Sequence, residues 1–251
     1  MIRETMAMKE ENLNGQVAVI TGASSGIGEA TARRFARAGS RIVLAARRQE
    51  KLEALAKELE ELGTDVLVRR TDVTSYDEVQ GLVTGALERF GQVDVMVNNA
   101  GNALEKPVAE SRAEEMDFQI DVNLKGVCYG CRAVAPHMIS RQSGNIINIG
   151  SICSLKHYAN YAAYVAAKFG VLGFSRSFYE EVRPHGVRVN VLCPAAVNTA
   201  WSDLAGAELP WRREERLQPE DLAEMAMFCV TMPKRVQIDT VIAWPVCEST
   251  T

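Results

Sequence analysis

The chain has 251 residues, 47% of them hydrophobic, and its 28 basic and 32 acidic side chains give a net charge of −4. That balance forms no basic stripe and argues against nucleic acid as a partner. No run of about 20 apolar residues could span a membrane, and the polar residues 1–14 lack the apolar core of a signal peptide, so we predict a cytoplasmic protein.

Strand and helix patterns alternate from residue 17 to residue 243 without a linker. This alternation predicts one α/β domain at residues 15–251 behind a flexible leader at residues 1–14. Short apolar runs predict strands at residues 17–20, 41–46, 65–70, 93–97, 145–149, 187–192 and 237–243. Helical spacing predicts one helix that ends at residue 38 and others at 50–62, 76–90, 114–139, 161–182 and 220–231. Crossover connections then predict a single-domain Rossmann fold, a seven-stranded parallel sheet with helices on both faces.

The predicted helix at 114–139 contains Pro136, which we expect to bend its last turn. It also contains a CxxC pair, Cys128 and Cys131. No second CxxC or HxxxH accompanies this pair, so we interpret it as structural and predict no metal site. The six cysteines are scattered rather than spaced as a disulfide framework, which fits a reducing compartment.

A glycine-rich turn, TGASSGIG at residues 21–28, separates the first strand from the first helix. Glycines let backbone N–H groups approach a phosphate at the positive end of the following helix, and serine hydroxyls add donors. A strand, a glycine turn and a helix within one βαβ unit predict a dinucleotide site. The expected contacts are Gly22, Ser24, Ser25, Gly26, Ile27 and Gly28.

The end of the second strand indicates which dinucleotide binds. A carboxylate there would hold the ribose 2′-hydroxyl of NAD, whereas arginine accepts the 2′-phosphate of NADP. The strand ends in Arg47 and Arg48, with no acid. We therefore predict NADP(H) as the cofactor, with Arg47 as the first contact and Arg48 as the second. The alternative is that both arginines only solvate the start of the second helix.

Tyr164 and Lys168 stand four residues apart in the predicted helix at 161–182. They share a helix face, roughly 6 Å apart along the axis, so the cation should lower the phenol pKa toward the working pH. A YxxxK pair alone is more often an ordinary aromatic beside a solvated lysine. Ser151 changes the interpretation, because it follows the strand at 145–149 and should lie at the carboxyl edge of the sheet.

These motifs together resemble the short-chain dehydrogenase/reductase family from residue 17 to the C-terminus. The resemblance implies a catalytic tetrad in which Asn123 joins Ser151, Tyr164 and Lys168. It also implies further cofactor contacts, in the adenine-binding DV pair, the NNAG segment, the tetrad and the PAAVNT segment at 194–199. These contacts are Asp72, Val73, Asn99, Ala100, Gly101, Tyr164, Lys168, Pro194, Val197 and Thr199.

The family pattern has a glycine where this chain has Ala195. An alanine there strains the backbone only if its φ is positive, by roughly 1 kcal/mol or more. The change therefore bears on the shape of the pocket floor rather than on the reaction.

The resemblance also implies a mechanism and a substrate class. Tyr164 would protonate the alkoxide formed when NADPH reduces a carbonyl group, Ser151 would orient that carbonyl, and Lys168 would hold the nicotinamide ribose. Asn123 would connect Lys168 to solvent. The expected substrate is a small ketone or aldehyde, or the corresponding alcohol, in contact with Asn102, Cys153, Tyr158, Tyr161 and Trp201.

Two other functions stay open at this point. One is a 3-oxoacyl thioester reductase, and the other is a non-catalytic dinucleotide sensor, which would have no need of the tetrad. The resemblance further implies a homodimer or homotetramer built on the helices at 114–139 and 161–182. The apolar segment at 241–246 could add a second interface.

Overall fold

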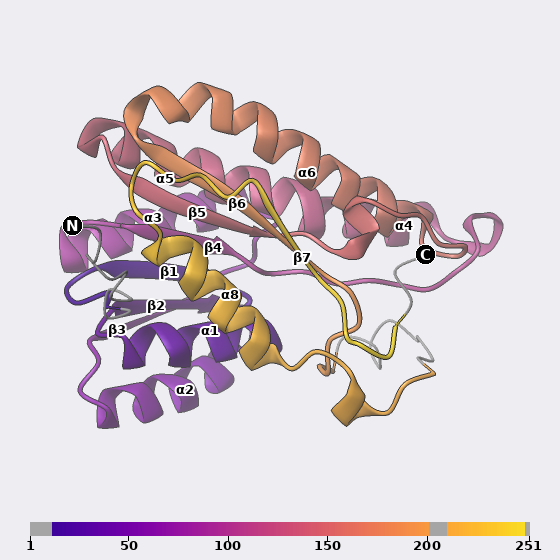
Figure 1. Cartoon of the computed structure of the whole chain (residues 1–251), viewed down its shortest axis with the longest axis horizontal. Helices are drawn as coiled ribbons and strands as arrows, with labels where there is room; N and C mark the ends of the chain where they lie inside the picture. The colour runs from indigo at the N-terminus through magenta and orange to yellow at the C-terminus, as the bar shows by residue number, and fades with distance from the viewer. Residues whose placement is uncertain (1–11, 201–209, 249–251) are drawn as a thin grey trace, which may run out of the picture.

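The computed structural model describes residues 12–200 and 210–248 of the chain, and Figure 1 shows their arrangement. Its strands are β1 Val17–Thr21, β2 Arg41–Ala46, β3 Val66–Arg70, β4 Val95–Asn98, β5 Gly144–Ile149, β6 Val187–Pro194 and β7 Thr240–Ala243. Its α-helices are α1 Gly26–Arg37, α2 Gln49–Glu61, α3 Tyr76–Phe90, α4 Ala113–Ile120, α5 Gly126–Arg141, α6 Ala162–Val182 and α8 Pro219–Thr231. A π-helix spans Asp121–Lys125, and 3₁₀ turns span Val108–Glu110, Ile152–Ser154, Arg183–His185 and Arg213–Glu215.

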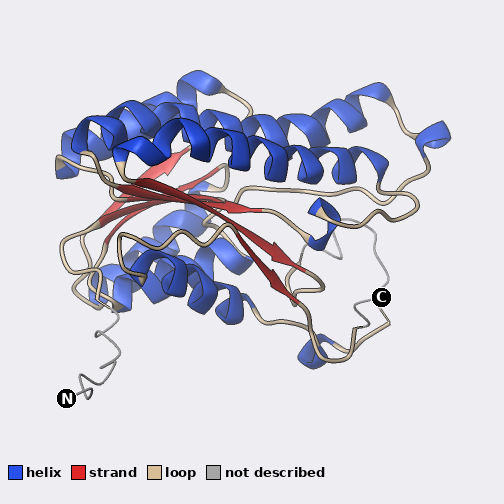
Figure 2. Ribbon diagram, turned by 45° about the horizontal axis from the view of Figure 1, so that its top comes forward, coloured by secondary structure: helices blue, strands red, loops and turns tan. Residues whose placement is uncertain are grey.

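The strands of the described ranges form one parallel sheet in the order β3-β2-β1-β4-β5-β6-β7, drawn in red in Figure 2. The predicted seven-stranded parallel sheet is therefore confirmed. Val19 of β1 lies between Val43 of β2 and Met96 of β4. The strand order reverses at β1, and open α/β sheets bind ligands in the crevice that such a reversal leaves at the carboxyl ends of the strands.

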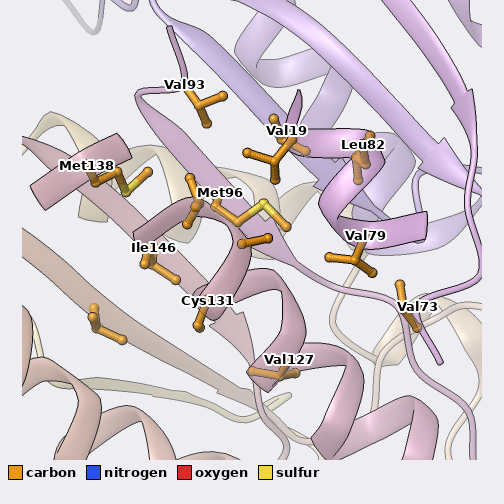
Figure 3. Packing of buried hydrophobic residues seen from close by; sticks show 14 of the residues in the cluster. Val19, Val73, Val79, Leu82, Val93, Met96, Val127, Cys131, Met138 and Ile146 are labelled. Atoms are coloured by element: carbon orange, nitrogen blue, oxygen red, sulfur yellow. The ribbon is translucent and has the colours of Figure 1, made fainter. Parts of the chain in front are cut away.

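Helices cover both faces of the sheet, with α1, α2 and α8 on one face and α3, α5 and α6 on the other (Figures 1 and 2). Figure 3 shows the second of these cores, where Met96 and Ile146 of the sheet lie near Leu82 of α3 and Cys131 of α5. Because both faces are covered, the inner strands are almost entirely buried and appear in the sequence as short continuous apolar runs. The edge strands β3 and β7 are only partly buried.

The segment predicted as one helix at 114–139 is helical throughout, but it is not one regular α-helix. The chain instead forms α4, the π-helix Asp121–Lys125 and then α5, which continues past Pro136 to Arg141. The π turn contains Asn123, which is fully buried and uses its side-chain amide to donate to the backbone carbonyls of Gln119 and Asn102. Single π turns of this kind are frequent at functional sites.

The last strand is shorter than the predicted range 237–243. It begins at Thr240, because the Gln237 side chain donates to the backbone carbonyls of Val189 and Ile238 in place of a ladder bond. The strand ends at Ala243, and Pro245 after it has no N–H to continue a ladder. The predicted apolar segment at 241–246 is therefore only partly strand.

The last residues of the segment predicted as a leader belong to the packed domain. Leu13 is 1% exposed, and its backbone N–H donates to the carbonyl of Ala38 at 2.7 Å. Among the helices that the structure describes, none combines the length and the apolar character needed to cross a membrane.

Candidate active site

The turn after β1 can approach a ligand closely only because it is built from glycine. Gly22 has a φ of +65°, and a Cβ on it would stand 2.8 Å from Cα of Ala100. A Cβ on Gly28 would stand 2.6 Å from the carbonyl oxygen of Gly22. Helix α1 begins at Gly26, so its N–H groups face the turn. This is the cradle that a dinucleotide pyrophosphate requires.

Thr21 fixes the turn to the neighbouring strand β4. Its hydroxyl oxygen accepts hydrogen bonds from the backbone N–H groups of Asn99, at 3.0 Å, and Ala100, at 3.2 Å. The Asn99 amide donates in return to the carbonyls of Thr21, at 3.0 Å, and Gly22, at 3.2 Å. Asn99 and Ala100, two of the expected cofactor contacts, therefore lie beside the glycine turn, and Thr21 is a supporting residue that the sequence did not single out.

The two arginines after β2 take different positions. Arg48 donates from Nη2 to the hydroxyls of Ser24, at 2.8 Å, and Ser25, at 2.6 Å. Arg47 instead lies over the ring of Phe118 on α4, with 5.8 Å between Cζ and the ring centroid. Arg48, the second of the two predicted contacts, is therefore the arginine that touches the glycine turn. Sequence cannot show which way adjacent side chains point.

Asp72 lies at the carboxyl end of β3 in a defined orientation. Its Oδ1 accepts hydrogen bonds from the backbone N–H of Thr74 at 3.0 Å and from its hydroxyl at 2.8 Å. Burial opposes ionisation of Asp72, but the Thr74 bonds and the nearby charge of Arg47 hold the pKa of Asp72 below its ordinary value. Val73 next to it is buried against Gly126, where a Cβ would come within 2.9 Å of the valine.

Ser151, Tyr164 and Lys168 come together at the end of β5. The Ser151 hydroxyl accepts a hydrogen bond from the backbone N–H of Cys153 at 3.2 Å and is also hydrogen-bonded to Tyr164. The Lys168 ammonium, one helical turn beyond Tyr164, lies 5.6 Å from the tyrosine ring centroid and donates to the carbonyl of Ile149 at 2.8 Å. All three side chains are buried.

The predicted lowering of the Tyr164 pKa is wrong for this structure. Burial raises the pKa of Tyr164, the nearby Cys153 thiol adds to the rise, and the hydrogen bond with Ser151 offsets only part of it. Burial likewise lowers the pKa of Lys168 to about 8. Desolvation outweighs the helical spacing because it disfavours the charged form of both groups. The phenol is thus held neutral, the form that can donate a proton.

Asn123 lies beside Lys168 and fixes the segment after β4. A Cβ on Gly101 would stand 3.0 Å from Asn123 Oδ1 and 3.9 Å from Lys168 Nζ, so these two groups flank that glycine. Asn123 Nδ2 donates to the carbonyl of Asn102 at 2.8 Å, and its Oδ1 accepts from the Asn102 N–H at 3.2 Å. Asn102, predicted as a substrate contact, therefore belongs to the framework that holds Asn123.

The sequence did not reveal a series of buried, hydrogen-bonded polar side chains near the site. Asn98 at the end of β4 donates to the Asn148 side chain of β5 at 2.8 Å, and Asn148 donates to the Ser175 hydroxyl of α6 at 2.8 Å. Cys131 of α5 lies 3.5 Å from the Asn98 amide. The sequence feature that could have indicated this hydrogen-bonded series is an asparagine at a buried position in each of two strands.

An apolar cluster adjoins the tyrosine on the expected substrate side. It contains Ala103, Ile152, Cys153 and Tyr164, with Tyr161, Val165, Ala195 and Trp244 packed against it. Tyr161 stacks edge-on against Tyr164 with 6.3 Å between ring centroids. Tyr158 is 41% exposed, and burial together with the charges of Cys153 and Glu248 raises its pKa. Trp201, the remaining predicted substrate residue, lies outside the described residues.

The chain after β6 is held by C-terminal residues that the sequence did not identify. Ala195 N–H donates to the Ala243 carbonyl at 2.9 Å, and Ala196 N–H donates to Glu248 Oε2 at 3.2 Å. Among the described non-glycine residues, positive φ occurs only at Gln142 and Asn160. Ala195 is therefore unstrained, and nothing is lost by the absence of glycine there.

The fold and this site define an oxidoreductase that uses a nicotinamide dinucleotide. The sequence model of the short chain dehydrogenases matches residues 16–209. The chain belongs to the short-chain dehydrogenase family.

Similar proteins cover nearly the whole chain. A protein of Staphylococcus aureus (strain USA300), described as an uncharacterized oxidoreductase, is 37% identical over 234 residues, which are 93% of this chain and 99% of that protein. The alcohol dehydrogenase of the archaeon Thermococcus sibiricus, complexed with 5-hydroxy-NADP, has a TM-score of 0.86 at 34% identity and covers 94% of this chain and 99% of its own. A short chain dehydrogenase/reductase of Burkholderia phymatum in complex with NAD has a TM-score of 0.83 at 30% identity, covering 91% of this chain and 89% of its own.

Proposed function

We propose that this protein is an NADP(H)-dependent oxidoreductase that interconverts a ketone or aldehyde and the corresponding alcohol, with Tyr164 as general acid and base. The observation that carries the proposal is the buried Tyr164 hydroxyl, hydrogen-bonded to Ser151 and held neutral, with the Lys168 ammonium beside its ring. These groups stand at the carboxyl edge of the sheet, where the strand order reverses and a dinucleotide is expected.

The residues expected at the adenosine end of the cofactor support NADP(H) over NAD(H). Arg48 presents its guanidinium beside the hydroxyls of Ser24 and Ser25, where a 2′-phosphate would gain charge-assisted hydrogen bonds. Arg47 adds a second positive charge, and no acid stands at the end of β2. The similar alcohol dehydrogenase is complexed with an NADP derivative, although another similar structure contains NAD. We assign Arg48 as the main phosphate contact and Arg47 as the second.

The remaining contacts follow the predicted set. When bound, NADPH supplies the hydride that reduces the carbonyl carbon of the substrate. Asp72 and Val73 would contact the adenine, and Asn99, Ala100 and Gly101 would line the cofactor behind it. Pro194, the last residue of β6, would also contact the cofactor, and Val197 and Thr199 after it would hold the nicotinamide carboxamide.

The protein groups then handle the proton. Ser151 donates a hydrogen bond to the carbonyl oxygen and holds it next to Tyr164. The Tyr164 hydroxyl donates its proton to that oxygen as negative charge develops, and the Lys168 ammonium stabilises the phenolate that is left. Asn123 flanks Gly101 together with Lys168 and would connect the lysine to solvent, so that a new proton replaces the one transferred. Proton transfer by a positioned side chain contributes about 10²- to 10⁴-fold to the rate.

Replacing the proton donor tests this proposal. Tyr164→Phe should reduce turnover of a ketone with NADPH by at least about 10²-fold, while the dissociation constant for NADPH, measured by fluorescence titration, stays unchanged. Tyr179→Phe on the same helix, at a half-buried position packed against the core, is the matched control and should behave as wild type. Turnover of Tyr164→Phe at the wild-type rate would refute the assignment.

The assembly and the location stay predictions. A homodimer or homotetramer on α5 and α6 is supported by Phe169 of α6, a large apolar side chain that is 45% exposed in the single chain. Mass measurement in solution would decide between the two. The cytoplasmic location rests on the sequence alone.

A further inference from the structure

The segment after β4 carries an exposed carboxylate, Glu105, next to Tyr161, one of the predicted substrate contacts. Glu105 Oε2 accepts a hydrogen bond of 2.8 Å from the Tyr161 hydroxyl. The backbone N–H of Lys106 donates to the carbonyl of Asn160 at 2.8 Å. These two bonds join the segment to the residues that precede α6. The Glu105 carboxylate is thereby fixed at the far end of the Tyr161 ring, whose edge packs against Tyr164.

The charge of the Glu105 carboxylate is not neutralised by an ion pair in the described part of the chain. Within residues 12–200 and 210–248, no lysine, arginine or histidine forms an ion pair with this carboxylate. The adjacent Lys106 is engaged by Glu115 at 3.0 Å, and Arg112 binds the same glutamate. The only side-chain partner of Glu105 in this part of the chain is the neutral tyrosine, so its negative charge is uncompensated.

The other charges on this side offset one another. Glu248 accepts the Ala196 N–H, and the positive charge of Lys156 acts on its ionisation. Lys156 also lies over the Trp244 ring, with 4.8 Å from Nζ to the ring centroid. The rest of the cluster around Tyr164 is apolar or aromatic. Among the described residues beside Tyr161, the exposed carboxylate without an ion-pair partner is therefore that of Glu105.

We propose that Glu105 binds a protonated amine of the substrate, so that the substrate class is ketones and alcohols that carry an ammonium group. This inference rests on the oxidoreductase function proposed above. An ammonium group next to the carboxylate would form a charge-assisted hydrogen bond, and a carboxylate on the substrate would be repelled. The bond from Tyr161 holds the carboxylate in place, and the length of the tyrosine ring sets the distance from the amine to the reacting carbon.

The test uses three matched series of methyl ketones of increasing chain length. One series ends in a dimethylammonium group, the second in its neutral isopropyl isostere, and the third in a carboxylate. The tertiary amine keeps a charge and one N–H donor but cannot condense with its own carbonyl group. For each length, kcat/KM with NADPH is measured, and the expected order is ammonium above isopropyl above carboxylate, with an optimum at one length.

Two exposed glutamates of the same segment serve as variants. Glu105→Gln keeps the shape and the acceptor for Tyr161 but removes the charge. It should lower the ammonium preference over isopropyl by about fivefold, the upper end for an exposed ion pair. Glu110→Gln, at an exposed position in the 3₁₀ turn Val108–Glu110, should leave the preference unchanged. In the wild type, added NaCl should weaken the preference, because salt screens exposed charges.

A binding measurement separates this inference from the proposed function. Calorimetry should show that the amino ketone binds the enzyme–NADP⁺ complex, which has no hydride to transfer to it, more tightly than its isopropyl isostere in the wild type, but not in Glu105→Gln. If the enzyme reduces the neutral ketones but shows no preference for the ammonium series, the role of Glu105 is wrong and the proposed function stands. The same holds if the preference survives in Glu105→Gln. Absence of NADPH oxidation with every ketone would overturn the proposed function together with the inference that rests on it.

Discussion

The ammonium group of Lys168 donates a hydrogen bond of 2.8 Å to the carbonyl oxygen of Ile149, the last residue of β5. Only Gly150 separates Ile149 from Ser151. The bond therefore fastens the helix that carries Tyr164 to the strand that positions the serine. It also explains how a lysine that is only 4% exposed can be tolerated, since a buried ammonium needs a partner.

The buried lysine should give the protein an unusual dependence of stability on pH. Its pKa is lowered to about 8 by burial, whereas an unfolded lysine titrates near its ordinary value of 10.5. Between these values the unfolded chain holds a proton that the folded chain has released, so the free energy of unfolding rises with pH. Burial raises the pKa of Tyr164, so above about pH 10 the tyrosine has the opposite effect.

Urea unfolding of the cofactor-free protein at about pH 7 and about pH 9.5 measures the effect. Lys168 should contribute a rise of about 1–3 kcal/mol in the unfolding free energy between these two values. Lys168→Met removes the titrating group, and the rise attributable to it should vanish. An identical change with pH in the variant and the wild type would show that the lysine is not its source.

The arginine that touches the glycine turn should dominate the preference for NADPH. Arg48→Ala removes the guanidinium held by Ser24 and Ser25 and should weaken NADPH binding by about 10- to 100-fold, as expected for charged hydrogen bonds of about 1.5–3 kcal/mol. Arg47→Ala should weaken it less. The affinity for NADH should change little in both variants, because NADH has no 2′-phosphate. Fluorescence titration with both cofactors checks this, and a larger loss in Arg47→Ala would restore the order predicted from sequence.

The sequence was sufficient wherever a local pattern determines the structure. The strands could be located because a sheet covered on both faces needs continuous apolar runs, and helix α3 has the predicted bounds of 76–90. The Ser151, Tyr164 and Lys168 motif could be found because its spacing places the three groups at one edge of the sheet.

Other features depend on contacts between distant residues. The π turn at Asn123 exists because its side chain bonds to the segment at Asn102, and no periodicity records that contact. The Tyr164 pKa is set by burial, which a spacing of four residues does not reveal. Glu105 is far from Tyr161 in sequence and lies in a loop without a motif, so only the structure shows that the two side chains are hydrogen-bonded.

Glu248, the last residue that the structure describes, should influence how the nicotinamide end of the cofactor binds. Glu248 accepts a hydrogen bond from the N–H of Ala196, the residue before Val197, which is assigned to the carboxamide. Glu248→Ala removes that acceptor and should weaken NADPH binding by about 3- to 10-fold, as for the loss of one hydrogen bond of about 0.5–1.5 kcal/mol. Glu248→Gln keeps an oxygen acceptor and should retain most of the affinity. Equal losses in the two variants would mean that the charge, rather than the hydrogen bond, matters.

Arg188 of β6 should be important for stability rather than for catalysis. Arg188 is 7% exposed. Its guanidinium donates hydrogen bonds to backbone carbonyls in the last turn of helix α8 and in the segment that follows this helix. These are Val230 at 3.0 Å, Met232 at 3.0 Å, Val236 at 3.1 Å and Pro233 at 3.4 Å. A cation at a helix C-terminus also offsets the helix dipole. Arg188→Met fills the space but leaves these carbonyls without their donor, so the unfolding free energy should fall by about 2–4 kcal/mol.

Arg176→Met is the matched control, because Arg176 pairs with Asp239 at the surface, with both side chains more than half exposed. Exposed pairs contribute about 0–1 kcal/mol, so this variant should unfold almost as the wild type does. Arg188→Lys supplies a compact ammonium that cannot reach all of the carbonyls and should fall between Arg188→Met and the wild type. Urea unfolding measures all three, and equal stabilities of Arg188→Met and Arg176→Met would contradict the role given to Arg188. Because Arg188 lies away from the glycine turn and the tetrad, the folded fraction of Arg188→Met should bind NADPH with unchanged affinity.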